Sequence, residues 1–178
     1  MEYAKADGTG MPGVTVGTEV TRIGEVLKAD AGDLLLGPAA TEGAIKAKRL
    51  ADYRVLLFAT HGLVAGAVKG STEPGLVLTP PATATPEDDG FLTASEIATL
   101  RLDADLVVLS ACNTATSDGR PRAEGLSGLA RAFLSAGARS VVATHWAIPS
   151  EAAVEVTTRA VAARSAEPDL DWGRAIQR

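Results

Sequence analysis

Short runs of consecutive apolar residues alternate with amphipathic runs along most of this chain, and this alternation constrains the fold most strongly. Residues 54–60, 105–111 and 140–144 are apolar runs without a polar residue at every second position. A strand that is covered on both faces has such a sequence. The segments between them space their apolar residues as helices do, for example in residues 124–136. The sequence therefore predicts an α/β fold, a three-layer α/β/α sandwich with a mostly parallel sheet.

Capping residues indicate where several of the other predicted helices begin or end. Thr41 is a suitable N-cap for a helix over residues 41–50. Thr93 and Glu96 form a capping box that begins a helix running to about residue 100. Gly137 is placed to end the separate helix over residues 124–136. Further helices are expected over residues 19–29 and 150–164 and from 171 onward, and further short strands over 33–37 and 75–79.

The composition excludes several other classes of protein. The chain has 178 residues with 17 Lys and Arg against 22 Asp and Glu, a net charge of −5. This acidic balance argues against a surface for nucleic acid or for an anionic membrane. No apolar run approaches the roughly 20 residues of a membrane-spanning helix, and residues 1–13 lack the layout of a signal peptide. The single cysteine, Cys112, allows no internal disulfide and favours a reducing compartment, so we expect a cytoplasmic protein.

The N-terminal segment is rich in glycine and has no hydrophobic period. We therefore expect a flexible segment over residues 1–18 and one domain over residues 19–178. The string GTGMPG at residues 8–13 matches G-x-G-x-x-G. A dinucleotide site needs a strand before this motif and a helix that opens at it, and the sequence shows neither. A nucleotide-binding domain is therefore the weakest of the alternatives.

Two reactive side chains follow predicted strands. His61 and Gly62 come directly after the strand over residues 54–60, and Cys112 comes directly after the strand over residues 105–111. In an open parallel sheet, catalytic groups gather outside the carboxyl ends of the strands. If these two strands are neighbours, about 4.8 Å apart, the imidazole and the thiol leave the sheet side by side.

A histidine beside a cysteine fits nucleophilic catalysis. A free thiol is mostly protonated at neutral pH, and a nearby imidazole can take its proton and later return it to a leaving amine. The backbone N–H groups of Gly62 and Cys112 could form an oxyanion hole. This chemistry needs no metal or organic cofactor, and one cysteine with two histidines nearly excludes a structural Cys/His zinc site. A lone cysteine at a strand end is also a common buried core residue, so that reading stays open.

Four other residues are candidates for a substrate pocket: Asp88, Asp89, Asn113 and His145. The two aspartates lie in a proline-rich loop and could attract a basic substrate side chain, or simply be solvated. Asn113 directly follows the cysteine. His145 follows the third apolar strand and could face the same crevice or pack beside Trp146.

Several strings occur in an order that points to one family. Cys112 lies 51 residues after His61, close to the caspase spacing of about 50. Around the cysteine, only Ala111 and Cys112 agree with the caspase pattern itself. The chain resembles CHAT domains, caspase-like modules often attached to TPR repeats. The matching strings are LFATHG (57–62), EPGLVL (73–78), LTASEI (92–97), LSACNT (109–114), GLSGLARAF (125–133) and GARSVV (137–142), followed by His145 and Trp146.

The resemblance implies a clan CD cysteine peptidase fold in which His61 and Cys112 are a catalytic dyad acting on a protein or peptide substrate. It runs from about Gly32 to the C-terminus, and Ala115 stands where many members carry glycine. The same fold with an idle dyad would instead be a non-catalytic interaction module.

The resemblance also implies that the domain is incomplete and shortened at both ends. Family members have a further central strand upstream, and the helix expected from residue 171 has no stop signal. TPR-type regulatory repeats are expected upstream in the full-length protein. A missing strand exposes a sheet edge, which favours self-association.

Overall fold

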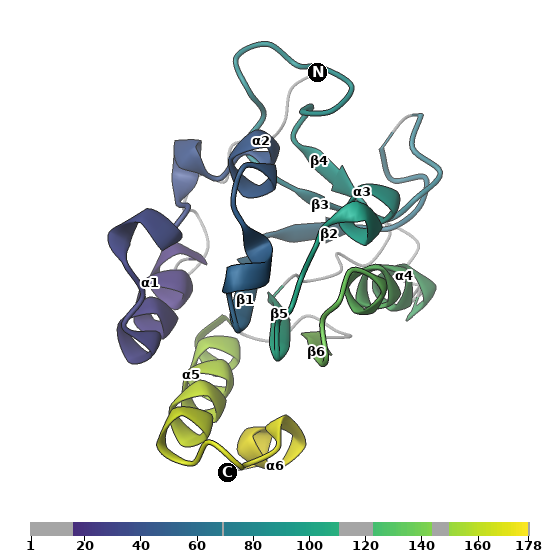
Figure 1. Cartoon of the computed structure of the whole chain (residues 1–178). Coiled ribbons are helices and arrows are strands. Elements are labelled where there is room, and N and C mark those ends of the chain that lie inside the picture. Colours follow the sequence, from purple (N-terminus) through teal and green to yellow (C-terminus); the bar gives the residue numbers. More distant parts are fainter. Residues whose placement is uncertain (1–15, 69, 111–122, 144–149, 178) are drawn as a thin grey trace.

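Three parallel strands form the centre of the molecule. The computed structural model describes residues 16–68, 70–110, 123–143 and 150–177. In sheet A, the strands lie in the order β1-β5-β6, and β5 pairs in parallel with both neighbours (Figure 1). They are β1 (Val55–Ala59), β5 (Leu106–Ser110) and β6 (Val141–Ala143). The three apolar strands predicted from the sequence are confirmed, and so is a mostly parallel sheet.

Helices cover both faces of sheet A, as the sequence predicted. α1 (Val16–Leu27) and α5 (Ser150–Ala166) lie on one face, while α3 (Ala94–Thr99) and α4 (Ala123–Ser135) lie on the other (Figure 1). The three-layer α/β/α arrangement is therefore confirmed. α1 begins at Val16, whereas the sequence pattern placed its start at Glu19.

The central strand β5 is buried on both faces. Val107 and Leu109 belong to the main hydrophobic core, on the side of α4. Leu106 and Val108 are also buried. They alternate with Val107 and Leu109 along the strand, so their side chains point to the opposite face of the sheet. This two-sided burial explains why the strand is apolar at every position before Ser110.

A second, antiparallel sheet was only partly predicted. Sheet B consists of β2 (His61–Leu63), β3 (Gly75–Val77) and β4 (Phe91–Thr93), in the order β2-β3-β4. The sequence pattern indicated β3 but neither of its neighbours. Strands of 3 residues are too short to show the two-residue period that marks a longer strand.

Capping side chains fix the helix starts where the sequence predicted them. The Thr41 hydroxyl accepts a hydrogen bond from the backbone N–H of Ala44, at 3.1 Å, and begins α2 (Glu42–Lys46). Thr93 and Glu96 form the complete capping box of α3. α2 ends at Lys46, before the predicted end at residue 50, and a 3₁₀ turn (Leu50–Asp52) follows. The helix expected from residue 171 is α6 (Trp172–Ile176).

The strand predicted over residues 33–37 is wrong. Two 3₁₀ turns, Ala31–Asp33 and Gly37–Ala39, enclose this segment. Leu34 and Leu36 between them have extended backbone angles but pair with no described strand. The three leucines made the segment look like a buried strand, but a 3₁₀ turn interrupts it at each end.

Gly137 ends α4 because no other residue fits there. Its φ of +115° lies in the region that side chains rarely adopt, and a Cβ atom would stand 2.2 Å from the Leu102 carbonyl oxygen. The predicted C-cap is therefore confirmed.

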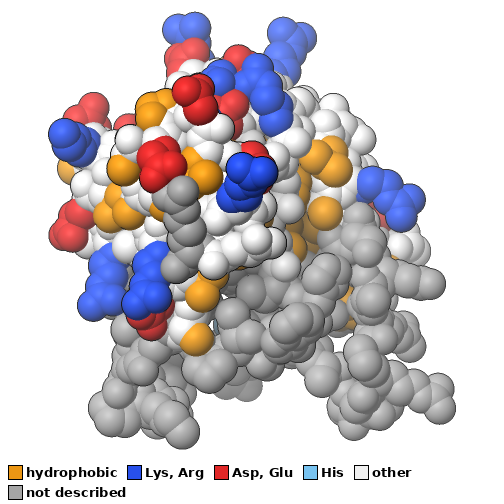
Figure 2. Space-filling model, turned by 90° about the horizontal axis from the view of Figure 1, so that it is seen from below, with side chains coloured by type: hydrophobic (Ala, Val, Ile, Leu, Met, Phe, Trp, Pro, Cys, Tyr) orange, Lys and Arg blue, Asp and Glu red, His pale blue; other side chains and the backbone are white. Residues whose placement is uncertain are grey.

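The described surface carries charges of both signs. On the face shown in Figure 2, Lys and Arg side chains are interspersed with Asp and Glu, so no broad patch of one sign forms among the residues described there. Within the described ranges, no helix is both long and apolar enough to cross a membrane.

Candidate functional site

The two strands that precede His61 and Cys112 are direct neighbours. β1 and β5 run parallel, and their last residues, Ala59 and Ser110, are in register. His61 lies two residues after Ala59, and Cys112 lies two residues after Ser110. Adjacent strands are about 4.8 Å apart. The two strands that lead to these residues therefore end side by side, at the same edge of sheet A. Cys112 itself, with Asn113 and His145, lies outside the described residues.

The position of His61 is fixed by the passage from sheet A to sheet B. The hydroxyl of Thr60, between β1 and β2, donates a hydrogen bond to the Val77 carbonyl oxygen. His61 then begins β2 and pairs with Val77. Its side chain is exposed, and no described residue forms a hydrogen bond or ion pair with it. The imidazole is therefore accessible at the carboxyl edge of sheet A.

Gly62 follows His61 inside β2. It is buried and lies in register with Leu76 of β3. Its backbone N–H is thereby held in a strand directly after the histidine, and a fixed donor of this kind suits the oxyanion role expected from the sequence.

The acidic loop lies at the same end of sheet B as His61. It connects Val77 of β3 to Phe91 of β4, and Val77 is in register with both His61 and Phe91. Asp89 is exposed, and one of its carboxylate oxygens accepts a hydrogen bond from the Phe91 backbone N–H at 2.8 Å. Asp88 is half-buried, and its Oδ1 atom has no hydrogen-bond partner. The loop thus begins and ends at the His61 end of sheet B, and Asp89 has a local structural contact within it.

A buried carboxylate anchors this loop, and no sequence pattern indicated it. Glu42 in α2 is 1% exposed and accepts hydrogen bonds from the backbone N–H groups of Asp89 and Gly90, at 3.1 and 3.3 Å. Lys46 Nζ lies 2.6 Å from Glu42 Oε1 and 2.9 Å from Glu96 Oε1. One ammonium group therefore joins α2 to α3 while Glu42 holds the loop.

The pKa values of Glu42 and Glu96, the two glutamates that pair with Lys46, are shifted in opposite directions. Burial of Glu42 raises the pKa of its carboxyl, and this effect exceeds the opposing hydrogen bond from Lys46. Burial also raises the pKa of Glu96, but hydrogen bonds from the backbone and hydroxyl of Thr93 and from Lys46 outweigh it and lower the pKa to about 2. Glu96 is therefore the carboxylate that stays ionised most firmly.

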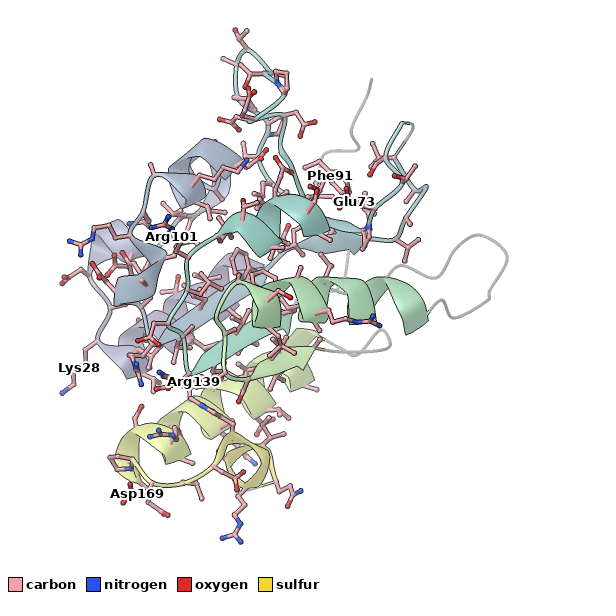
Figure 3. The ribbon with its side chains drawn as sticks, turned by 45° about the vertical axis from the view of Figure 1, so that its right-hand side comes forward. Lys28, Glu73, Phe91, Arg101, Arg139 and Asp169 are labelled. Atoms are coloured by element: carbon pink, nitrogen blue, oxygen red, sulfur yellow. The ribbon has the colours of Figure 1, made fainter. Side chains whose placement is uncertain are left out.

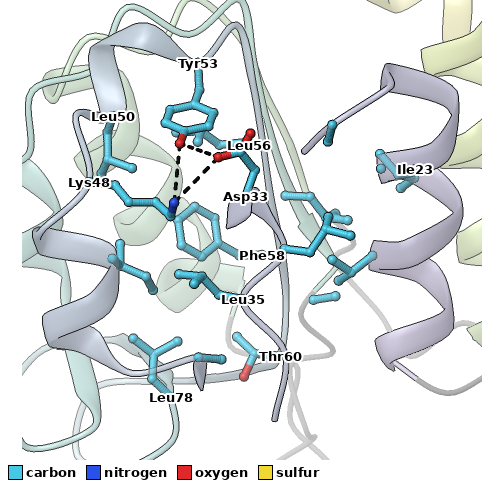
Figure 4. A pocket seen from close by; sticks show the side chains of 18 of the residues that line it. Ile23, Asp33, Leu35, Lys48, Leu50, Tyr53, Leu56, Phe58, Thr60 and Leu78 are labelled. Carbon is cyan, nitrogen blue, oxygen red and sulfur yellow. Dashed lines mark hydrogen bonds and ion pairs between the residues drawn. The ribbon is translucent and has the colours of Figure 1, made fainter. Parts of the chain in front are cut away.

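A cavity of about 880 Å³ runs along the outer side of β1. Within the described ranges, β1 has no strand on that side, because it is the first strand in the order of sheet A. Apolar side chains from α1 and from the loops that flank β1 form the walls (Figure 4). They include Ile23, Leu35, Leu50 and Leu78.

Polar residues lie at one end of this cavity (Figure 4). The Tyr53 hydroxyl donates a hydrogen bond to Asp33 Oδ1 at 2.7 Å, which lowers the pKa of Asp33, and Lys48 Nζ lies 3.6 Å from the same oxygen. His61 is not among the residues that line the cavity. Ala59, Thr60, Val77 and Asp89 do line it, so the cavity reaches the residues next to His61 without including the histidine itself.

In this α/β/α domain, a histidine follows the carboxyl end of a central strand. The domain therefore belongs to the broad class of folds that gather reactive groups at the carboxyl ends of their strands. A family model described as "CHAT domain" matches residues 10–171 of this chain. The chain therefore belongs to the CHAT domain family, which is caspase-like and related to cysteine peptidases. The resemblance noted in the sequence is confirmed.

One curated relative connects this chain to repeat proteins. A segment of 59 residues, 33% of this chain, is 48% identical to part of Tetratricopeptide repeat protein 28 of Mus musculus. The match covers 2% of that protein. The chain is thus similar to a small portion of a much longer protein, whose name refers to tetratricopeptide repeats.

Proposed function

We propose that this chain is a caspase-like cysteine endopeptidase domain. The observation that supports this most directly is the parallel pairing of β1 and β5 with Ala59 and Ser110 in register. Because His61 and Cys112 follow these residues at equal distances along the chain, both can approach one substrate carbonyl. Membership of the CHAT family supports the same assignment.

The proposed reaction proceeds through an acyl-enzyme. His61 takes the proton of the Cys112 thiol, and the Sγ atom bonds to the scissile carbonyl carbon. The backbone N–H groups of Gly62 and Cys112 donate hydrogen bonds to the oxyanion that forms. The C–N bond then breaks, and His61 returns the proton to the leaving amine. Water, deprotonated by His61, attacks the thioester and releases the carboxylic acid and the thiol.

The substrate is a protein or peptide, and no cofactor takes part in these steps. Asp88, Asp89, Asn113 and His145 are proposed to border the substrate pocket. The loop that holds Asp88 and Asp89 lies at the His61 end of sheet B, which supports this role for the two aspartates. TPR-type repeats elsewhere in the full-length protein are proposed to regulate the site, in a cytoplasmic setting.

A non-catalytic interaction module is the second candidate. It is favoured by the absence, among the described residues, of any group that hydrogen-bonds to the His61 side chain. A catalytic base is commonly oriented by a third group. In this case the same fold would bind a partner while the dyad stays idle.

Labelling with electrophilic peptide probes separates these functions. A library of peptides that carry a thiol-reactive group at the C-terminus is incubated with the wild type, Cys112→Ala and His61→Ala. We expect labelling of the wild type that depends on the peptide sequence, no labelling of Cys112→Ala and slow labelling of His61→Ala. Equal labelling of wild type and Cys112→Ala would contradict the peptidase assignment. Labelling of the wild type without any preference for peptide sequence would favour the interaction module.

A further inference from the structure

One face of sheet B presents a row of side chains beside His61. Directly paired residues of neighbouring strands point to the same face of a sheet, so His61, Val77 and Phe91 share one face. Leu76 and Leu92, on the other face, are fully buried in the core. His61 is exposed, and Val77 and Phe91 are partly exposed. The accessible face therefore places an apolar surface next to the candidate catalytic histidine.

Phe91 is held in a fixed position on this face. Its ring lies over Gly75, since a Cβ atom on Gly75 would stand 2.6 Å from the ring's Cζ atom. Its backbone N–H donates a hydrogen bond to Asp89, and β4 continues directly into α3 (Figure 3). Leu63 extends the same face in β2, in register with Gly75. An aromatic ring that covers a glycine and keeps part of its surface exposed is a rigid apolar contact.

The chemistry of the histidine decides which part of a substrate meets this surface. His61 gives its proton to the leaving amine, so it must lie beside the nitrogen of the scissile bond. Side chains that border His61 on sheet B therefore border the leaving half of the substrate. Two strand spacings of about 4.8 Å separate Phe91 from His61, which corresponds to about three residues of an extended peptide.

We propose that Phe91 and Val77 form a subsite for an apolar side chain within the first three residues after the scissile bond. This inference rests on the proposed peptidase function and adds a preference on the leaving side of the substrate.

The experiment compares substrates that do and do not fill the subsite. A proteome-derived peptide library is digested by the wild type, and mass spectrometry identifies the new N-termini. A mixture of peptidyl aminomethylcoumarin amides, varied in the residue before the scissile bond, has no peptide on the leaving side. The variants are Phe91→Ala and the nearly isosteric Val77→Thr, which leaves the ring over Gly75 in place. Leu134→Ala, at an exposed apolar residue of α4, is the control.

We expect apolar residues to be enriched by about tenfold or more at one of the first three positions after the scissile bond. Apolar pockets discriminate between substrate side chains by factors of this size. Phe91→Ala and Val77→Thr should reduce this enrichment, while cleavage of the coumarin amides stays within about twofold of the wild-type rate. Leu134→Ala should change neither. Cleavage without apolar enrichment, or with enrichment unchanged in both variants, overturns the subsite but leaves the peptidase intact. If the wild type produces no more new N-termini than Cys112→Ala and cleaves no coumarin amide, the peptidase function and the subsite both fail.

Discussion

Ala59 and Ser110 lie in register at the ends of two adjacent parallel strands. His61, the first residue of β2, and Cys112 each follow these residues by two positions in the sequence. This register joins two strand ends that are 51 positions apart in the sequence, through backbone pairing alone. The proposed dyad depends on it, and the first prediction tests it.

Replacing His61 by alanine is expected to shift the pH profile of Cys112 alkylation toward alkaline pH. An adjacent imidazole promotes ionisation of the thiol, whereas an isolated thiol ionises near pH 8.5. At pH 7 we therefore expect the rate with iodoacetamide to fall by about tenfold or more in His61→Ala. The measurement is the rate of mass gain at a series of pH values. His145→Ala is the control, and equal profiles for the wild type and both variants would count against the pairing of His61 with Cys112.

Sequence reasoning could locate this edge because three independent signals converge there. The apolar strands predict neighbours in a parallel sheet, the reactive residues follow strand ends, and the motif order identifies the family. The capping residues Thr41 and Thr93 were also predictable, since each acts through a backbone group three positions along the chain.

Features that depend on distant parts of the chain could not be predicted. The burial of Glu42 requires Lys46, the Asp89 and Gly90 backbone and a neighbouring helix, of which only Lys46 is local. β2 and β4 have too few residues for a pattern, and they become strands because β3 pairs with both. The surface formed by Val77 and Phe91 beside His61 was missed for this reason.

Glu42→Ala is expected to destabilise the fold by about 1–3 kcal/mol, because it leaves the backbone N–H groups of Asp89 and Gly90 without their acceptor. Lys46 keeps Glu96 and the Glu87 carbonyl oxygen as acceptors. Glu42→Gln keeps an acceptor oxygen and should have a smaller effect. Urea unfolding measures both. The control is Glu155→Ala, which removes an exposed pair with Arg159 and should change stability by less than about 1 kcal/mol. Similar losses in Glu42→Ala and Glu155→Ala would show that Glu42 does not anchor the loop.

The contribution of Glu96 to stability should disappear in acid. Its pKa falls from 4.5 to about 2 in the folded protein, so the ionised carboxylate stabilises the fold above about pH 4.5. This stabilisation is lost as the pH falls from 4.5 toward 2, because the unfolded chain binds the proton first. The pKa of Glu42 is shifted upward and acts in the opposite direction.

The comparison of wild type with Glu96→Gln isolates this contribution. We expect the difference in unfolding free energy to be greatest near neutral pH and to shrink below about pH 4.5, as measured by urea unfolding at each pH. The glutamine keeps an acceptor for the Thr93 backbone N–H and removes the charge that pairs with Lys46. A difference that stays constant down to pH 2 would contradict the assigned shift.

The outer edge of β1 is expected to cause self-association. The Arg54 carbonyl accepts a hydrogen bond from Leu106, so alternate residues of β1 direct their backbone groups toward β5. Val55, Leu57 and Ala59 therefore direct theirs toward the cavity on the other side, where no described strand accepts them. Unpaired strand edges between apolar walls favour pairing with another chain.

Leu34→Lys tests this edge, because Leu34 lines the cavity from the segment beside α1. A charge there should oppose entry of a second chain, as inward-pointing lysines do on natural edge strands. Sedimentation velocity should show concentration-dependent association for the wild type and a shift toward monomer for Leu34→Lys. Leu134→Lys introduces the same charge at an exposed leucine of α4 that does not line the cavity, and it should associate like the wild type. Equal dissociation in both variants would mean that net charge, rather than the β1 edge, controls association.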